Sequence, residues 1–198
     1  MAKRVFDLVV ATFALLLVSP LLLLAMLAVK LDSPGPVFFR QERVGRGGRV
    51  FRIHKLRTMR ADAPDTGPAV TAHEDPRVTR VGGMLRHHHI DELPQLIDVI
   101  KGHMSLVGPR PEVPRFVAAY PPALRDVVLA VRPGLTDPAA LEFVDEAALL
   151  ERASDPERAY VEQILPRKLQ TQAEYLRRAT LASDIAVLGR TLRMLLAR

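Results

Sequence analysis

An uninterrupted apolar run near the N-terminus constrains this chain more than any other feature. The segment Leu8–Val29 contains no charged side chain, and charged residues stand just outside it, among them Lys3, Arg4 and Lys30. A helix of this length extends about 33 Å, close to the thickness of the hydrocarbon core of a bilayer. A soluble chain would need a larger domain to bury such a helix, and the apolar part of a secretory signal is usually shorter. The run therefore predicts a helix that inserts into a membrane.

A helix breaker, Ser19-Pro20, lies near the middle of this run. Proline removes one backbone donor and clashes with the preceding turn, so a bend is predicted there. The Ser19 hydroxyl is placed to satisfy a carbonyl group that the bend frees. Two topologies fit these residues: a kinked single span, and a re-entrant hairpin that enters and leaves by the same face. Basic residues flank both ends, so the distribution of charge leaves the two topologies open.

The composition excludes several classes of protein. The chain has 198 residues, 48% of them hydrophobic and 25% charged, which suits one folded domain and excludes wholesale disorder. The absence of cysteine excludes disulfides, thiolate nucleophiles and cysteine-ligated metals. With no tryptophan and 5% aromatic residues, the chain offers few rings for base stacking, and we expect no nucleic-acid partner. The net charge of +6 suits phosphate-bearing partners.

After the apolar run the composition changes, and we divide the chain into a membrane helix, 1–32, and one folded unit, 33–198. Short strands are predicted at 37–39 and 50–53, joined through the glycine-rich loop 45–48 as a small β-hairpin. A helix is predicted over 91–100, with its apolar residues on one face. The predicted fold class is α+β and mostly helical.

The C-terminal segment is amphipathic from Tyr175 onward. Its apolar positions alternate with arginines, a pattern that suits a helix lying on an anionic membrane surface. The same pattern suits a helix that packs on the core and turns a basic face to solvent, and both interpretations stay open. The apolar positions are Leu176, Leu181, Ile185, Leu188, Leu192 and Leu195.

Two adjacent acids, Asp91 and Glu92, stand at the start of the predicted helix 91–100, where the helix dipole favours anions. Acids are common in first turns, so the pair alone is a weak signal. A carboxylate among phosphate-binding groups can hold Mg²⁺ or attack phosphorus as a nucleophile. Basic residues occur in nearby Gly- and Pro-rich regions, where they would either bind phosphate or belong to a solvated surface. They are Lys55, Arg57, Arg80, Arg86 and Arg110.

A run of three histidines, His87–His89, precedes the acids. Consecutive side chains diverge in both helices and strands, so the three rings are not expected to converge on one metal ion. The chain also contains no HExxH motif. We interpret these histidines as surface residues close to the acidic pair.

Several long motifs, in order over nearly the whole chain, identify a resemblance. The sequence resembles the bacterial sugar transferase family, the small monotopic phosphoglycosyl transferases that start glycan assembly on polyprenol phosphate. The set is far more specific than any one of its members. The matching segments are KRVFD at Lys3, SPGPVFFRQERVG at Ser33, FRIHKLRTM at Phe51, DPRVTRVG at Asp75, DELPQL at Asp91, KGHMSLVGPRP at Lys101 and VRPGLTDPA at Val131.

The resemblance assigns roles to particular residues. It implies that the N-terminal helix is re-entrant, broken at Ser19-Pro20, with both ends cytoplasmic. Asp91 matches the nucleophile and Mg²⁺ ligand of a catalytic dyad, and Glu92 matches its assisting partner. The resemblance also implies substrate-binding positions. Lys55, Arg86 and Arg110 match positions that bind phosphate and nucleotide, and Asp184 matches a further position near the site.

The implied reaction moves a sugar-1-phosphate from a nucleotide diphosphate sugar, expected to be a UDP-sugar, to polyprenol phosphate. Mg²⁺ would be the cofactor, and a phosphosugar on Asp91 the intermediate. The reaction would take place at the cytoplasmic face of the bacterial inner membrane, as the first membrane step of polysaccharide assembly. Two alternatives remain: a non-catalytic, membrane-anchored basic module that binds lipid or a partner, and a nucleotide-sugar hydrolase that needs no lipid.

Overall fold

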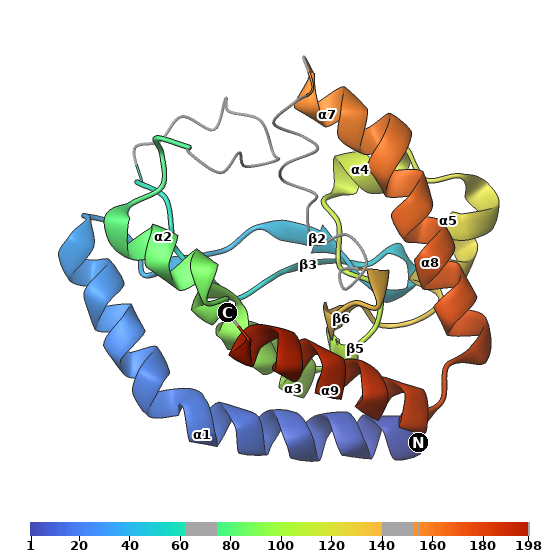
Figure 1. Cartoon of the computed structure of the whole chain (residues 1–198), viewed down its shortest axis with the longest axis horizontal. Helices are drawn as coiled ribbons and strands as arrows, with labels where there is room; N and C mark the ends of the chain where they lie inside the picture. Colours follow the sequence, from blue (N-terminus) through green and yellow to red (C-terminus); the bar gives the residue numbers. More distant parts are fainter. Residues whose placement is uncertain (62–74, 140–152, 154, 198) are drawn as a thin grey trace.

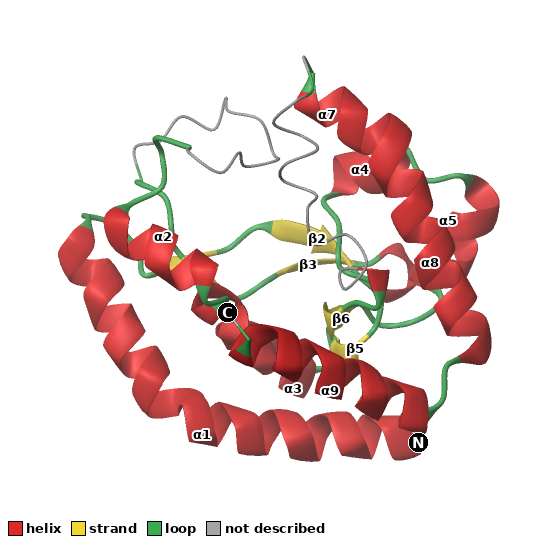
Figure 2. Ribbon diagram, viewed as in Figure 1, coloured by secondary structure: helices red, strands yellow, loops and turns green. Residues whose placement is uncertain are grey.

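The computed structural model describes residues 1–61, 75–139, 153 and 155–197, and within them the chain is mostly helical with a few short strands (Figures 1 and 2). The mostly helical prediction is confirmed. The α-helices are α1 Ala2–Asp32, α2 Arg80–His87, α3 Leu96–Lys101, α4 Pro114–Ala118, α5 Pro122–Leu129, α7 Pro156–Ala159, α8 Leu165–Arg178 and α9 Leu181–Leu196. The short 3₁₀ turns are η1 Arg46–Gly48 and η2 Ile90–Gln95, and η4 Tyr160–Ile164 is a π-helical turn.

Helix α1 is a continuous helix of 31 residues that bends along its length (Figure 1). Pro20 lies inside it and supplies no N–H group. The carbonyl oxygen of Leu16, four residues earlier, accepts a hydrogen bond from the Ser19 hydroxyl at 2.8 Å. The serine thus satisfies the group that the proline leaves without a partner, and the two residues produce a bend rather than an interruption.

One face of α1 is apolar and exposed. Val9, Phe13, Leu16, Leu17 and Leu24 are each more than 60% exposed. In the described part of the chain, α1 is the one helix that is long and apolar enough to cross a membrane by length and composition. A large exposed apolar surface is costly in water, so this face requires a lipid or protein partner.

The opposite face of α1 packs on the rest of the described chain, which lies inside the angle of the bend (Figure 1). Its N-terminal arm joins a hydrophobic cluster with α3, strand β5 (Ser105–Val107) and α9, through Ala11 and neighbouring residues. Its C-terminal arm joins a second cluster with strand β4 (Lys55–Leu56), α2 and η2, through Leu22, Ala25 and Val29. A third cluster joins strand β2 (Glu42–Val44) to α4, α5, η4 and α8. Both arms of α1 therefore contact the same body.

In the part of the chain that the structure describes, the strands form three two-stranded sheets. Strand β2 (Glu42–Val44) pairs with β3 (Val50–Arg52) as an antiparallel hairpin, and η1 forms its glycine-rich loop. The small hairpin is therefore confirmed, but its first arm is Glu42–Val44 and not 37–39. Strand β1 (Phe38–Phe39) instead pairs with β4 (Lys55–Leu56), because the backbone N–H of Ile53 bonds to the carbonyl of Gln41 and carries the pairing beyond the hairpin.

The third sheet is parallel and requires glycine. Strand β5 (Ser105–Val107) pairs with β6 (Gly134–Thr136). A Cβ atom at Gly134 would lie 2.2 Å from the backbone nitrogen of Gly108, so any other residue would push the two segments apart. This close approach fixes the turn Gly108–Pro111 that follows β5.

Candidate active site

The two acids of the dyad lie on η2, directly before α3. His89 takes a left-handed conformation with φ 54° and begins the turn. The predicted helix 91–100 is thus a 3₁₀ turn followed by α3, and it ends as predicted at Gly102, whose φ is 83°. Pro94 lies inside the 3₁₀ turn, where it cannot donate to an α-helical ladder. Asp91 is almost fully buried, with 2% of its surface exposed.

Lys55 lies between the two carboxylates. Its ammonium nitrogen is 3.1 Å from Oδ2 of Asp91 and 3.1 Å from Oε1 of Glu92. The strand β4 directs Lys55 toward η2, while the next side chain, Leu56, is fully buried in the second cluster. The sequence prediction that Lys55 belongs near the acidic pair is matched by this contact, whereas its role in phosphate binding stays a prediction.

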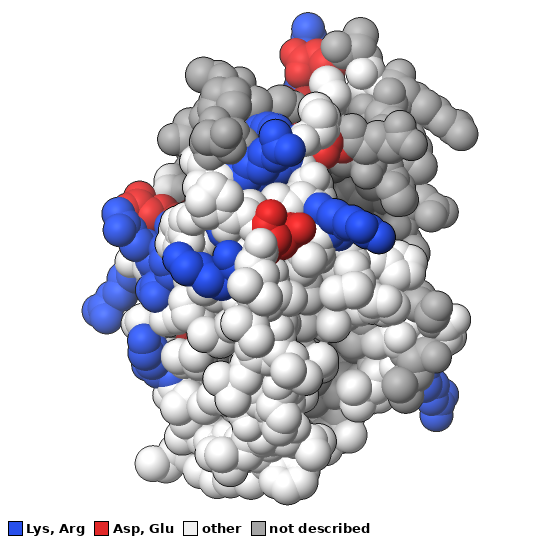
Figure 3. Space-filling view, turned by 90° about the vertical axis from the view of Figure 1, so that its left-hand side faces the viewer, with Lys and Arg blue, Asp and Glu red and all other residues white. Residues whose placement is uncertain are grey.

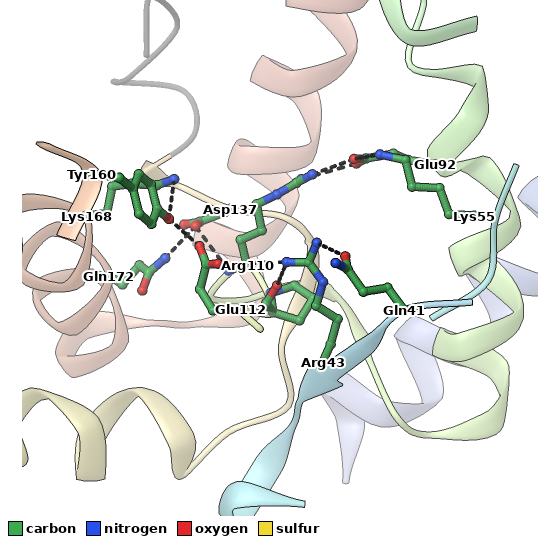
Figure 4. A network of polar contacts seen from close by, with 11 residues as sticks. Gln41, Arg43, Lys55, Glu92, Arg110, Glu112, Asp137, Tyr160, Lys168 and Gln172 are labelled. Carbon is green, nitrogen blue, oxygen red and sulfur yellow. Dashed lines mark hydrogen bonds and ion pairs between the residues drawn. The ribbon is translucent and has the colours of Figure 1, made fainter. Parts of the chain in front are cut away.

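Arg110 binds Glu92 from the other side, through both guanidinium nitrogens (Figure 4). The nitrogen Nη2 of Arg110 donates to Oε1 of Glu92 at 2.5 Å, and Nη1 donates to Oε2 at 3.2 Å. Such a two-pronged contact fixes the plane of both groups. Arg110 keeps 39% of its side chain exposed, so part of this side chain borders solvent.

A buried network holds the backbone of the Arg110 turn. The carboxylate of Asp137, which is 1% exposed, accepts hydrogen bonds from the backbone N–H of Arg110 at 3.1 Å and from the side chain of Gln172 at 2.6 Å. On the other side of the turn, Tyr160 donates to Glu112 at 2.5 Å (Figure 4). Helix α8 and η4 thus fix Arg110. The sequence motifs assigned no role to these residues, although Asp137 lies within the segment VRPGLTDPA and Glu112 directly follows KGHMSLVGPRP.

A second buried pair holds Lys55. Asp98 on α3 is fully buried and accepts two hydrogen bonds from His54, one from its backbone N–H at 2.8 Å and one involving its ring nitrogen Nδ1 at 2.7 Å. His54 directly precedes Lys55, and α3 directly follows the turn that carries the dyad. The pair therefore ties the strand of the cation to the helix of the carboxylates. Nothing in the sequence pattern pointed to Asp98.

The two acids differ in their protonation. Burial raises the pKa of Asp91 above its usual range, and the nearby Lys55 opposes this effect only in part. Burial would also raise the pKa of Glu92, but Arg110 and Lys55 together hold that pKa well below its ordinary value. Glu92 is therefore a fixed negative charge. Asp91 is the more basic carboxylate and so the better nucleophile of the two.

Three further arginines predicted to bind substrate differ in their surroundings. Arg86 on α2 donates to the hydroxyl of Thr58 at 2.7 Å, and the charge of Asp91 acts on its guanidinium. Arg57 is buried, and its guanidinium donates to the carbonyls of Pro34 and Ser33. Its contacts are those of a residue that holds the turn after α1. Arg80 is exposed at the start of α2.

Asp184 on α9 lies in a different set of contacts. Its carboxylate accepts a hydrogen bond from Lys3 at 2.6 Å and another from the hydroxyl of Tyr175. Within residues 1–61, 75–139, 153 and 155–197, it forms no hydrogen bond or ion pair with Lys55, Asp91, Glu92 or Arg110. The structure thus places Asp184 where the N-terminus of α1 meets α9.

Comparison with known proteins identifies the family of this chain. The model of the family described as bacterial sugar transferase matches residues 1–198. The chain belongs to this family. The resemblance inferred from the motifs is thereby confirmed.

Several similar proteins are named as sugar phosphate transferases that use undecaprenyl phosphate. The chain is 50% identical over 147 residues to the UDP-glucose:undecaprenyl-phosphate glucose-1-phosphate transferase of Caulobacter vibrioides, covering 68% of this chain and 51% of the relative. It is 38% identical over 188 residues to the protein of the same name from Escherichia coli, covering 93% of this chain and 38% of the relative. It is 49% identical over 118 residues to the UDP-N-acetylgalactosamine-undecaprenyl-phosphate N-acetylgalactosaminephosphotransferase of Aeromonas hydrophila, covering 60% and 28%. The chain thus spans about half or less of the length of these relatives.

Proposed function

We propose that this protein transfers a sugar-1-phosphate from a UDP-sugar to a polyprenol phosphate, releasing UMP and forming a polyprenyl diphosphate sugar. The observation that carries the proposal is the Asp91–Glu92 pair, with Asp91 buried, held between Lys55 and Arg110. Transfer of a phosphoryl group needs cations fixed where negative charge builds up, and these two cations are fixed. The names of the relatives, which are undecaprenyl-phosphate sugar phosphotransferases, support the choice of donor and acceptor.

The proposed mechanism has two displacements at phosphorus. In the first, a carboxylate oxygen of Asp91 attacks the phosphorus that bears the sugar, the bond to the bridging oxygen breaks, and UMP leaves with that bonding pair. In the second, a phosphate oxygen of the lipid attacks the same phosphorus, and Asp91 leaves as a carboxylate. Each step needs only one bulky substrate at the site. In the described part of the molecule, Oδ1 of Asp91 accepts no hydrogen bond, which leaves it available to react.

Glu92 is proposed to act as the fixed anion that orients the two cations. Both of its carboxylate oxygens are engaged, one by Lys55 and Arg110 and the other by Arg110 alone. Because its pKa lies well below the ordinary value, Glu92 is ionised throughout the neutral range and carries no proton to exchange. Its removal would leave Lys55 and Arg110 without a common partner.

The residues at the site fit a magnesium ion. Mg²⁺ prefers carboxylate oxygens and commonly uses one or two of them together with substrate phosphates. Of the two carboxylates of the dyad, Oδ1 of Asp91 is the oxygen without a hydrogen bond in the described part of the molecule, because Lys55 and Arg110 occupy the carboxylate of Glu92. When bound, the ion would neutralise charge on the diphosphate of the donor.

The contacts at the two ends of α1 support a proposal for the membrane topology. Near its start, Arg4 donates to the carbonyls of Val99 and Ile100 on α3, and at its end Asp32 accepts from the backbone N–H of Val81 on α2. Both ends are thus bound to one polar body, which occupies one side of a bilayer. We therefore propose a re-entrant α1 with both ends at the cytoplasmic face of the inner membrane.

The surface of the molecule supports this placement. On the face seen from the side of α1 and α2, Lys and Arg gather in the upper and middle parts, and the lowest part of that face shows no charged residue (Figure 3). Helix α9 adds exposed apolar side chains at Leu181, Ile185 and Leu192, while its Val187 is buried in the cluster shared with α1. We propose that α9 lies at the membrane interface and also packs on the core, so the two interpretations of its pattern are compatible.

Single-cysteine labelling tests the topology. Ala2→Cys and Leu31→Cys are expected to react with a membrane-impermeant maleimide from the cytoplasmic side only, because both ends of α1 are bound to the same body. The chain has no native cysteine, so the background is clean. Leu17→Cys, on the exposed apolar face near the bend, is the matched control and should resist labelling from either side. Reaction of Ala2→Cys from the periplasmic side would show a full span.

A release assay tests the function. The purified protein with Mg²⁺, a lipid acceptor and a panel of UDP-sugars should release UMP with one or a few members of the panel and form a lipid-linked diphosphate sugar. Release of free sugar phosphate without lipid would identify a nucleotide-sugar hydrolase instead. Absence of UMP with every member, from protein that is inserted in the membrane, would favour a non-catalytic module.

A further inference from the structure

A basic cleft lies beside the glycine-rich loop of the hairpin, outside the set of residues that surround the dyad. Its volume is about 480 Å³, within the range typical of small-ligand sites. It is formed between the end of β2, η1, β3, the turn after α3 and the segment before β6. The side chains that line it are Arg46, Arg49, Val50, Phe51, His103 and Arg132.

In the described part of the chain, the arginines of the cleft have no carboxylate partner, while His103 lies 3.8 Å from the buried Asp98. The guanidinium groups of Arg46 and Arg49 form no hydrogen bond or ion pair within the described part of the chain, and no carboxylate is among the described residues that line the cleft. Among the described residues, Arg132 binds through its Nε alone, which donates to the carbonyl of Gly102 at 2.8 Å. By contrast, Arg110, Arg115 and Arg158 each bind a carboxylate. Three arginines facing one cavity without an anion are arranged for an anionic ligand.

The arrangement suits a phosphate group. Guanidinium groups bind phosphate oxygens through paired N–H donors, and three groups around one cavity can bind one phosphate group from several directions. The cleft also has an apolar side, because Val50 is 54% exposed and the ring of Phe51 packs against that of His103 at 5.4 Å. An organic phosphate ester, which carries both an anion and a less polar remainder, fits both parts.

The cleft also lies close to the first turn of α1. Gly102, which forms part of its wall, follows the carbonyls of Val99 and Ile100 that Arg4 holds. If α1 begins at the membrane surface, as the proposed function has it, the cleft faces the level of lipid headgroups. We propose that this cleft binds a phosphate ester, from a phospholipid headgroup or from solution, through Arg46, Arg49 and Arg132.

A tryptophan reporter tests the proposal. The chain has no tryptophan, and Val50 is an exposed strand residue in the cleft, so Val50→Trp gives a single local signal on the full chain in a neutral detergent. Dihexanoyl phosphatidylglycerol, dihexanoyl phosphatidylcholine, glycerol 3-phosphate and inorganic phosphate are titrated separately. We expect a saturable change with phosphatidylglycerol at lower concentration than with phosphatidylcholine. Equal midpoints for phosphatidylglycerol and glycerol 3-phosphate would assign the site to soluble esters.

Matched charge variants complete the test. In the Val50→Trp background, Arg46→Gln with Arg49→Gln is expected to raise the midpoint at least tenfold. Arg115→Gln with Arg158→Gln removes the same charge elsewhere and should change it less than twofold. The inference is overturned if no probe gives a saturable change, or if the first pair of substitutions leaves the midpoint unaltered. UMP release measured on the same preparation separates this failure from failure of the proposed reaction.

Discussion

Asp91→Asn is expected to abolish UMP release, with a loss of more than about 10⁴-fold, on the scale seen when the nucleophile of a covalent mechanism is removed. An amide nitrogen and oxygen are far weaker nucleophiles than a carboxylate, and the amide is also a weaker ligand for Mg²⁺. The measurement is initial UMP release with the UDP-sugar that gives the fastest turnover of the wild-type protein.

Two controls separate chemistry from folding in this variant. Asn has the shape of Asp, and burial already disfavours the charged form of Asp91, so the variant should unfold at a temperature no lower than the wild type. Asp126→Asn, at an exposed carboxylate on α5, should keep wild-type activity. Retention of more than a tenth of the activity by Asp91→Asn would remove Asp91 from the role of nucleophile.

Lys55→Ala is expected to lower turnover by about 10²–10³-fold, the usual loss on removal of one fixed group that stabilises developing charge. It should also change the pH profile. Asp91 must be ionised to attack, so activity rises with pH as Asp91 loses its proton, and the midpoint of this rise lies above 3.8, the ordinary value of an aspartate. Lys55 lowers the pKa of Asp91, so its removal should move the midpoint to higher pH.

The conservative variant tests the charge itself. Lys55→Arg retains a cation, so it should return the midpoint of the pH profile toward that of the wild type, even if turnover stays reduced. The measurement is UMP release across the acid range for the three proteins. An unchanged midpoint in Lys55→Ala, with reduced turnover, would show that Lys55 does not act on the ionisation of Asp91.

The parts of the fold that were predictable arise from local sequence. The apolar run predicted α1, and Ser19-Pro20 predicted a bend in it. Gly102 predicted the end of α3, where the backbone is left-handed and glycine is favoured. The hairpin loop was located, but the charged arm Glu42–Val44 has no apolar alternation and was missed. Phe38 and Phe39 were therefore assigned to the hairpin, whereas the structure pairs them with Leu56 and Lys55 of β4.

The candidate site was predictable as a set of residues but not as an arrangement. The motifs brought Lys55, Asp91, Glu92 and Arg110 together as candidates, and the structure places them in contact. The supports of these residues were not predictable, because each joins segments far apart in the chain. Asp98 holds the residue before Lys55, and Gln172 reaches Asp137 under Arg110. Such pairs have no local spacing that a sequence pattern reveals.

The difference between the two acids is the physical basis of the proposed two-step mechanism. Glu92 is engaged on both oxygens and ionised, while Asp91 is buried, more basic and free at Oδ1 in the described molecule. A carboxylate in that state suits attack on phosphorus, and a carboxylate held like Glu92 does not. The account therefore requires the sugar phosphate to be found on Asp91 and on no other residue.

Intact-protein mass spectrometry without the lipid acceptor tests this claim most directly. The protein is mixed with Mg²⁺ and the UDP-sugar that supports turnover, quenched, weighed and then digested. The account predicts an increase equal to one sugar phosphate, located on Asp91 and accompanied by a burst of UMP, and loss of the added mass when polyprenol phosphate is supplied. Unmodified protein, with UMP released only when the lipid is present, would contradict it.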